Sequence, residues 1–268
     1  MPTPAFLTRS DLAADCSRLG LCAGDAVMVH AAMRSVGRLL NGPDALIGAL
    51  LDTVGPGGTL LAYADWDGDY DALLDADGRV PAAWRAHLPP FDPLRSRAIR
   101  HNGVFPEFLR TTPGALRSGN PGASVVALGA RAADFTADHP LDYGYGEGSP
   151  FARLVAAGGK VLNVGAPLDT MTLLHHAEHL ARLKDKRIRR VEVPFAAPGG
   201  TKWRMIEEFD TGDPVVPTFA DDYFAEIVTD FLSTGEGTRG MIGEAPAVLV
   251  DAAAITAFAV AWMEQRAG

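Results

Sequence analysis

The segment from residue 160 to 184 predicts a β-strand, a tight loop and an α-helix in direct succession. Residues 161–164 form a short, mainly apolar run typical of a buried strand, and the Gly-Ala-Pro sequence at 165–167 ends it. Asp169 or Thr170 is then expected to cap the helix. A helix that begins just past the carboxyl end of a strand lies at the edge where α/β sheets bind their ligands. The segment therefore predicts an α/β fold with a functional site at this edge.

The expected helix has two faces of different character. Its apolar side consists of Leu173, Ala177, Leu180 and Ala181, and its polar side of His175, Glu178, His179 and Arg182. The apolar side is suited to packing against the sheet. The polar side is the candidate for chemistry, with His175 and Glu178 directed together at the edge of the sheet.

The residues of this polar face leave three interpretations open. His175-x-x-Glu178-His179 matches the H-x-x-E-H pattern of zinc peptidases, in which two histidines hold zinc and the glutamate activates water. A third zinc ligand would come from Glu207 or Glu226. Without a metal, His175 is a general base that Glu178 orients and whose protonated form it favours. The last interpretation is a solvated polar face with no chemical role.

Length and composition limit the classes of protein. The chain has 268 residues, enough for one large α/β domain, and its 47% hydrophobic and 21% charged residues are ordinary for a globular protein. No apolar run reaches the length of a membrane span and the N-terminus lacks a secretory signal, so a cytoplasmic location is expected. The formal net charge of −9 argues against nucleic acid as a partner and suits a cationic ligand.

The two cysteines, Cys16 and Cys22, do not indicate a disulfide framework. A helix is expected at residues 8–19, and Cys16 falls on its apolar side with Leu12 and Leu19. Burial of Cys16 is therefore favoured over a role as an acyl-carrying nucleophile.

Strands and helices alternate along the rest of the chain. Strands are expected at 26–30, 59–64, 124–129 and 247–250, helices at 43–54, 105–110, 221–232 and 252–265, and an antiparallel hairpin at 187–195 and 202–209. Residues 75–100, rich in proline and alanine, are expected to cross the surface. No internal repeat, linker or charge block divides the chain. The pattern predicts an α/β fold, a single three-layer α/β domain with a central mixed sheet over residues 1–268.

Two loops that follow expected strands carry candidate ligand-binding residues. Residues 31–37 could present backbone N–H groups and the Arg34 side chain to a phosphate. Residues 65–71 interleave four carboxylates with Trp66 and Tyr70, which would suit a polyammonium ligand. An ordinary connection in the first case and a solvated acidic loop in the second remain open.

Taken together, a series of motifs resembles the aminoglycoside 3-N-acetyltransferase family. The motifs lie in order at residues 29–37, 55–60, 63–66, 90–93, 117–121, 148–150 and 165–178. The resemblance extends from about residue 8 to 266. Residues 142–146 and 209–214 are most similar to the class III branch.

This resemblance implies the fold of that family and acetyl transfer from acetyl-CoA to the 3-amino group of the 2-deoxystreptamine ring of aminoglycoside antibiotics, which gives resistance. It implies that His175 is the base, that Glu178 is its carboxylate partner and that no metal takes part. The residues implied to bind CoA are His30, Met33, Arg34, Ser35, Val36, Gly37 and Ser118, and those implied to face the aminoglycoside are Trp66, Asp67, Glu208 and Asp210. A monomer or homodimer is expected, without nucleic acid or membrane as partner.

Three positions depart from the family pattern. Asn120 and His176 stand where relatives often carry other side chains, and Ala32 replaces a frequent serine, so the resemblance assigns these residues no role. Asp65 lies where relatives vary, and it is expected to tune the choice of substrate.

Overall fold

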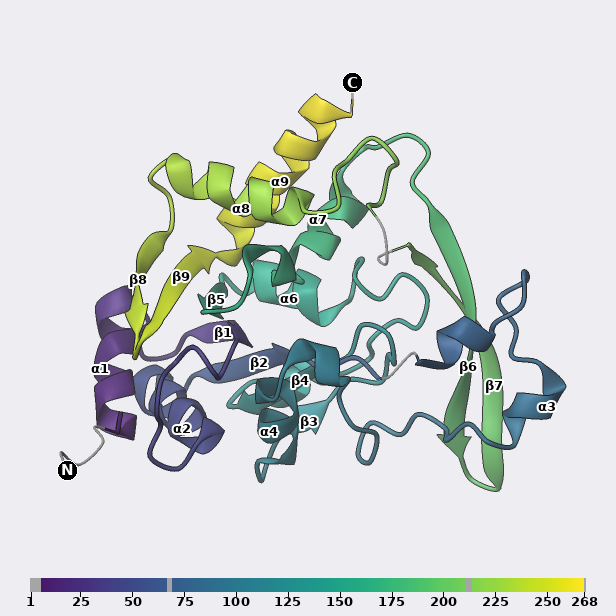
Figure 1. Cartoon of the computed structure of the whole chain (residues 1–268), viewed down its shortest axis with the longest axis horizontal. Helices are drawn as coiled ribbons and strands as arrows, with labels where there is room; N and C mark the ends of the chain where they lie inside the picture. The colour runs from purple at the N-terminus through teal and green to yellow at the C-terminus, as the bar shows by residue number, and fades with distance from the viewer. Residues whose placement is uncertain (1–5, 67–68, 211–213, 268) are drawn as a thin grey trace.

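A seven-stranded sheet forms the centre of the computed structural model, which describes residues 6–66, 69–210 and 214–267 (Figure 1). In sheet order the strands are β3 (Leu116–Arg117), β4 (Val125–Gly129), β2 (Thr59–Tyr63), β1 (Ala26–Ala31), β5 (Lys160–Val164), β9 (Ala245–Asp251) and β8 (Thr238–Ile242). β1 is parallel to its neighbours β2 and β5, and the other pairs are antiparallel. The sheet is therefore mixed, which confirms the predicted fold class.

Helices cover both faces of this sheet (Figure 1). One face packs against α1 (Arg9–Leu19), α2 (Pro43–Val54) and α4 (Phe105–Thr111), and the other against α5 (Ala132–Thr136), α6 (Pro150–Ala156), α7 (Leu174–Leu180), α8 (Tyr223–Ser233) and α9 (Ala252–Arg266). Successive strand residues alternate between the two hydrophobic cores: Val27 and Val29 enter one, Met28 the other. This gives the three layers predicted from the alternating elements. That residues 1–268 form one domain stays a prediction.

Helix ends in the structure follow local sequence signals. The Thr8 side chain caps α1, and Gly20 ends it in the left-handed region at φ 111°. Pro43 occupies the first turn of α2, and the Ser149 hydroxyl accepts a hydrogen bond of 3.1 Å from Ala152 N at the start of α6. The bounds of α1, α2 and α6 therefore agree with the sequence.

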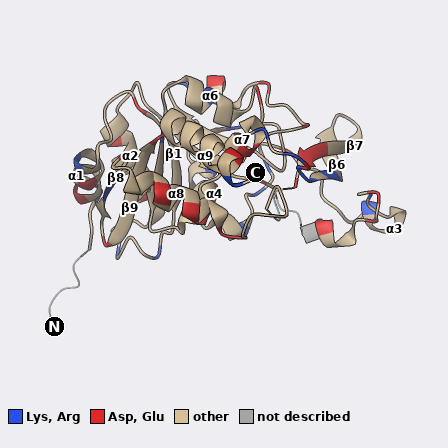
Figure 2. Cartoon of the chain, turned by 90° about the horizontal axis from the view of Figure 1, so that it is seen from above, with Lys and Arg blue, Asp and Glu red and all other residues tan. Residues whose placement is uncertain are grey.

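Outside the main sheet, the antiparallel strands β6 (Ile188–Ala197) and β7 (Gly200–Phe209) form a long hairpin at one end of the molecule (Figure 1). Acidic and basic segments lie side by side on this hairpin (Figure 2). In its register Arg189 is opposite Glu208, and Arg190 is opposite Glu207. The predicted hairpin is confirmed.

The segment 75–100 packs along β6. Phe91 N donates to Pro194 O at 2.8 Å, and Ala196 N donates to Phe91 O at 2.9 Å. The short helix α3 (Ala82–Arg85) follows the same path, between the 3-10 turns η1 (Asp69–Leu73) and η2 (Arg100–Asn102). The expected surface excursion is therefore fixed to the hairpin by backbone hydrogen bonds.

The prediction of where α7 starts was wrong. Residues 168–170 form a separate 3-10 turn, η3 (Leu168–Thr170), and no side chain caps α7. The Thr170 hydroxyl instead donates to Pro167 O at 2.6 Å within this turn. Thr170 therefore does not cap α7. Leu180, expected on the packed side, is 52% exposed because it is the last residue of the helix.

Strands β3 and β8 were not predicted. β3 has only two residues, too few to show a period. β8 is exposed along most of its length and therefore lacks apolar alternation.

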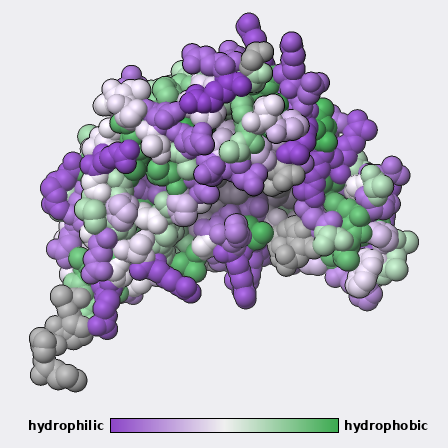
Figure 3. Space-filling view, turned by 45° about the horizontal axis from the view of Figure 1, so that its top comes forward, coloured by the Kyte–Doolittle hydropathy of each residue, from purple (hydrophilic) through white to green (hydrophobic). Residues whose placement is uncertain are grey.

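None of the helices in the described part of the chain is both long enough and apolar enough to cross a lipid bilayer. On the face shown in Figure 3, hydrophilic residues predominate and hydrophobic residues form small groups.

Candidate active site

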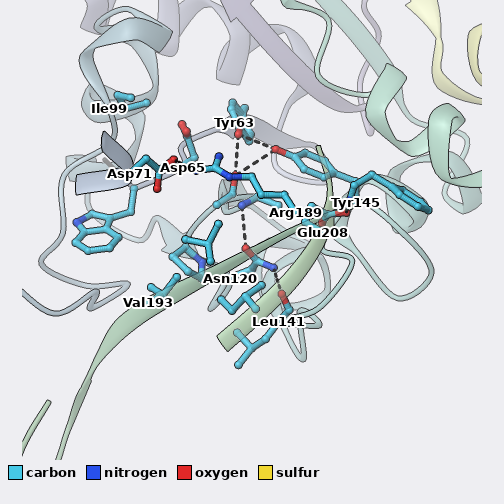
Figure 4. Close-up of a pocket in the computed structure, with 17 residues that line it drawn as sticks. Tyr63, Asp65, Asp71, Ile99, Asn120, Leu141, Tyr145, Arg189, Val193 and Glu208 are labelled. Atoms are coloured by element: carbon cyan, nitrogen blue, oxygen red, sulfur yellow. Dashed lines mark hydrogen bonds and ion pairs between the residues drawn. The ribbon is translucent and has the colours of Figure 1, made fainter. Parts of the chain in front are cut away.

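Two neighbouring cavities lie where the parallel strands β1, β2 and β5 reach their carboxyl ends. Each has a volume of about 370 Å³, within the usual range for small-molecule sites. The first, here called the acidic cavity, is lined by Tyr63, Asp65, Trp66, Asp71, Ile99, Asn120, Pro121, Gly122, Ala123, Leu141, Tyr145, Arg189, Val191, Val193, Ile206, Glu208 and Phe209 (Figure 4). The second, the histidine cavity, is lined by Val29, His30, Ala31, Ala32, Tyr63, His101, Asn102, Gly103, Pro106, Ala166, Pro167, Asp169, Thr170, Thr172 and His175. The site therefore lies at the edge of the sheet that the sequence predicted.

His175, which lines the histidine cavity, is paired with Glu178, a buried residue outside the lining. His175 Nδ1 lies 2.6 Å from Glu178 Oε2, one helical turn along α7. Glu178 is 2% exposed, and its second carboxylate oxygen accepts a hydrogen bond from the Tyr223 hydroxyl. Burial raises the pKa of Tyr223, so the phenol keeps its proton and remains a donor. The carboxylate is thus held from both sides, and Nε2 remains the imidazole nitrogen available to a ligand.

Aromatic rings fix the plane of the His175 imidazole. The ring centroids of Tyr145 and Phe224 lie 4.9 Å and 4.8 Å from that of His175. The imidazole side chain is 20% exposed, on the side of the cavity that it lines. Its orientation is therefore set by packing as well as by Glu178.

His30 lies in the same cavity at the end of β1. Its Nε2 atom is buried and has no hydrogen-bond partner among the described residues. Burial lowers the pKa of His30 to about 4, which keeps the imidazole neutral at physiological pH. His30 therefore lines the same cavity as His175 with an uncharged ring, and its implied role in binding CoA stays a prediction.

Tyr63 connects the two cavities. Its side chain lines both of them, and its hydroxyl lies 2.8 Å from the Tyr145 hydroxyl and donates to Gly122 O at 2.8 Å. A second connection runs from Asn102, which lines the histidine cavity, to the carboxylate of Asp65 in the acidic cavity. A ligand in one cavity is therefore close to a ligand in the other.

The carboxylates of the acidic cavity each have a partner. Burial raises the pKa of Asp65 to about 7, although the Asn102 amide and the charge of Arg117 act in the opposite direction. Glu208 Oε1 lies 2.9 Å from His179 Nε2, and Asp71 Oδ2 lies 2.6 Å from Arg189 Nη2. The wall is suited to a cationic ligand, and Trp66 lines it; that Trp66 faces an aminoglycoside stays a prediction.

The residues implied to bind CoA fall into two groups. His30 lines the histidine cavity, whereas Met33, Arg34, Ser35, Val36, Gly37 and Ser118 line neither cavity. Of this second group, Arg34 is exposed, while Val36 is buried in the core.

Ser118 is completely buried. Its hydroxyl accepts from Val125 N at 2.9 Å and contacts His139 Nδ1 at 2.8 Å. In this conformation Ser118 therefore supports the loop that carries Tyr145, since His139 also contacts Gly144 O at 2.6 Å.

Asp67 and Asp210 are also implied to face the aminoglycoside. Asp67 lies outside the described residues. Asp210 is half-buried, and its backbone N–H donates to Arg187 O at 2.9 Å, but it does not line either cavity.

The zinc interpretation finds no ligand set in this arrangement. Throughout residues 6–66, 69–210 and 214–267, no three His, Cys, Asp or Glu side chains are grouped closely enough to hold a metal ion. His175 is bonded to Glu178 and His179 to Glu208. Glu207 accepts from the Tyr143 hydroxyl at 2.6 Å and from Arg190 at 2.7 Å.

Sequence reasoning missed several residues of the site. Tyr223 and Arg189 come from α8 and β6, far along the chain from their partners. Tyr145 lies in the segment 142–146 that resembles the class III branch, but this segment follows no strand and the resemblance assigned Tyr145 no role. The acidic run at 65–71 was the one available signal, and it did identify Asp71.

Comparison with known proteins gives consistent matches. Residues 28–264 match the family model described as aminoglycoside 3-N-acetyltransferase. Aminoglycoside N(3)-acetyltransferase III of Pseudomonas aeruginosa is 47% identical over 251 residues, which cover 93% of this chain and 91% of that protein. Aminoglycoside N(3)-acetyltransferase VIII of Streptomyces fradiae is 45% identical, with 98% and 93% covered.

Solved structures agree. AAC-IIIb in a binary complex with CoASH superposes with a TM-score of 0.97 at 72% identity, covering 98% of both chains. Sisomicin-bound AAC-VIa superposes with a TM-score of 0.93 at 34% identity, covering 98% of this chain and 99% of that one. The family, the fold and the enzyme class predicted from the sequence are confirmed. This chain belongs to the aminoglycoside 3-N-acetyltransferase family of acyltransferases and, within it, to the class III branch.

Proposed function

We propose that this protein transfers the acetyl group of acetyl-CoA to the 3-amino group of the 2-deoxystreptamine ring of aminoglycosides, which gives resistance to these antibiotics. The family relatives carry this activity in their names, AAC-IIIb was solved with CoASH, and AAC-VIa was solved with sisomicin. The observation that carries the proposal is the His175–Glu178 pair beside two connected cavities, one of them acidic. A cytoplasmic location belongs to the same proposal.

In this proposal each cavity takes one substrate. The acidic cavity takes the polyammonium antibiotic, because carboxylates and an aromatic wall attract cations. The histidine cavity takes the thioester end of acetyl-CoA, and the loop 33–37, which continues from the end of β1, takes its pyrophosphate. The target amine then approaches the thioester near Tyr63, which lines both cavities.

His175 acts as the general base of the reaction. An ammonium group is not a nucleophile until it loses a proton. The ammonium group therefore first loses one proton to solvent, and Nε2 of His175 then accepts a second proton from the amine as its nitrogen attacks the thioester carbonyl. The C–S bond then breaks, the acetyl group stays on nitrogen as an amide, and the CoA thiolate leaves and takes the proton from the imidazolium. The Glu178 carboxylate, 2.6 Å from Nδ1, stabilises the imidazolium in between.

The test is release of the CoA thiol from acetyl-CoA in the presence of kanamycin or gentamicin, with and without EDTA. General-base catalysis contributes ~10²–10⁴-fold, so His175→Ala is expected to lower kcat at least about a hundredfold with little change in stability. His87→Ala is the matched control, because His87 is exposed and lines neither cavity.

The outcomes separate the parts of the proposal. Release that depends on the antibiotic, survives EDTA and collapses in His175→Ala supports it. A loss of less than about fivefold in His175→Ala removes His175 from the role of base while leaving the transfer activity in place. No release with any aminoglycoside overturns the function.

A further inference from the structure

Arg189 is the exception in the charge pattern of the acidic cavity. Among the described residues of its lining, the acidic side chains are the carboxyl groups of Asp65, Asp71 and Glu208. Among the described residues that line this cavity, Arg189 alone carries a permanent positive charge. A site for a polycation would gain nothing from a guanidinium in its wall, so the position of Arg189 requires an explanation.

Arg189 reaches across the cavity from the hairpin. Its position on β6 is opposite Glu208 on β7, and its guanidinium extends to Asp71, which lies in the 3-10 turn after β2 (Figure 4). The Arg189 Nη2 atom lies 2.6 Å from Asp71 Oδ2. The pair therefore joins two walls of the cavity that belong to distant parts of the chain.

The three carboxylates differ in what a ligand must displace. Asp65 is bonded by the neutral amide of Asn102, and Glu208 is bonded by His179, which packs outside the cavity. Among these three carboxylates of the described lining, Asp71 alone is paired with a full cation, Arg189, that itself lines the cavity. An ammonium group that binds Asp71 must therefore take the place of the guanidinium.

The exchange of one cation for another is physically easy here. The side chains of Arg189 and Asp71 are 40% and 35% exposed, and an ion pair this exposed contributes little net stability. The long arginine side chain can leave with its charge hydrated. Its like charge still opposes a polycation nearby.

We propose that Arg189 is an internal competitor that occupies the ammonium position at Asp71 in the empty enzyme and is displaced by an amino group of the aminoglycoside. This inference rests on the proposed function. Arg189 is thus a specificity-determining residue. Arg189 weakens the binding of aminoglycosides, most strongly of those with a charged amino group near Asp71. A ligand with a hydroxyl at that position cannot displace the Arg189 guanidinium.

The test is isothermal titration of kanamycin into the wild type and Arg189→Gln. Removal of the competitor is expected to lower Kd about three- to tenfold. Arg190→Gln is the matched control, because Arg190 is the next residue of the same strand, pairs with Glu207 at 2.7 Å, is 69% exposed and does not line the cavity. Both variants change the net charge equally, so only R189Q is expected to bind more tightly.

A second measurement assigns the effect to Asp71. In an Asp71→Asn background the competitor has lost its partner, so adding Arg189→Gln is expected to change Kd by less than about twofold. Neomycin and paromomycin, which differ by one amino group replaced by a hydroxyl, are titrated into the same variants, and the gain from R189Q is expected to disappear for both in the Asp71→Asn background. A gain from R189Q that persists in that background would overturn the role of Asp71.

Unchanged or weaker binding in R189Q, or an equal gain in R190Q, overturns the inference. Arg189→Met, which keeps the aliphatic stem, replaces R189Q if thermal melting shows that the glutamine variant is unfolded. If the wild type binds none of these aminoglycosides, the proposed function fails instead, and the two failures are therefore distinguishable.

Discussion

His179 Nε2 lies 2.9 Å from Glu208 Oε1, and this contact joins the helix of the proposed base to the hairpin that lines the acidic cavity. The same Glu208 oxygen accepts a hydrogen bond of 2.8 Å from Phe209 N. The His179 ring also packs against Phe209, with centroids 4.5 Å apart. The Glu208 carboxylate is therefore oriented by His179, which does not line the cavity, and by the backbone of Phe209, so the geometry of α7 and that of the cavity are coupled.

This contact predicts a positioning role for His179. His179→Ala leaves Glu208 without its side-chain partner, so the KM for the aminoglycoside is expected to rise about tenfold, while kcat and the KM for acetyl-CoA change less than about twofold. Steady-state kinetics with each substrate varied in turn measure this split. Glu208→Gln combined with His179→Ala is expected to be less than additive. A fall in kcat similar to that of His175→Ala would show that His179 acts in the chemical step.

Tyr223 is predicted to support the base through Glu178. Tyr223→Phe removes the hydroxyl that donates to the buried carboxylate, and kcat is expected to fall about tenfold without a change in the KM for the aminoglycoside. A merely structural role would lower stability while leaving kcat unchanged. Phe219→Leu, a change in the ring packed on Tyr223 at 5.0 Å, controls for altered packing.

Asp65 predicts a specific pH dependence of stability. Its pKa is raised from the ordinary 3.8 to about 7 in the folded protein, chiefly by burial. The folded state therefore holds this proton more tightly than the unfolded state, and the stability that it contributes is full below pH 3.8 and lost as the pH rises to about 7. Asp65→Asn does not titrate. The free energy of unfolding of Asp65→Asn, relative to that of the wild type, is therefore expected to increase by about 2–4 kcal/mol as the pH rises from about 4 to about 7.

Urea unfolding across this pH range measures the difference. The exposed Asp11 gives a control of opposite sign, because the Thr8 side chain and backbone lower its pKa. Asp11→Asn is expected to lose stability relative to the wild type as the pH rises. A difference between Asp65→Asn and the wild type that is constant with pH would contradict the prediction.

The cysteines are predicted to differ sharply in reactivity. Cys16 is fully buried, and burial raises the pKa of its thiol to about 12, whereas Cys22 is exposed. A disulfide reagent such as Ellman's is expected to modify Cys22 in the folded protein and Cys16 only on unfolding. Modification of Cys22 is expected to leave acetyl transfer unchanged. Rapid reaction of two thiols in the native wild type and of the single remaining thiol in native Cys22→Ser, with loss of activity, would revive the acyl-cysteine interpretation.

Much of the fold followed from the sequence because its signals are local. Helix α2 was predicted with its observed bounds, since Pro43 starts it and Gly55 follows its last residue. The start of α7 was not, because Thr170 belongs to the 3-10 turn η3, where its hydroxyl donates to Pro167 O instead of accepting from a backbone N–H of the helix. Strand β8 carries no apolar alternation and depends on β9 for its pairing.

The sequence by itself determined the alternating elements, the buried strand that leads to α7 and the pairing of His175 with Glu178, because residues three apart on a helix are neighbours. The tertiary structure alone decided that Tyr223, 45 residues further along, holds Glu178 from its other side. It also decided that Arg189 on the hairpin reaches Asp71. The physical reason is that such contacts depend on how separate elements pack across the edge of the sheet, and the periodicity of one segment carries no information about a partner in another.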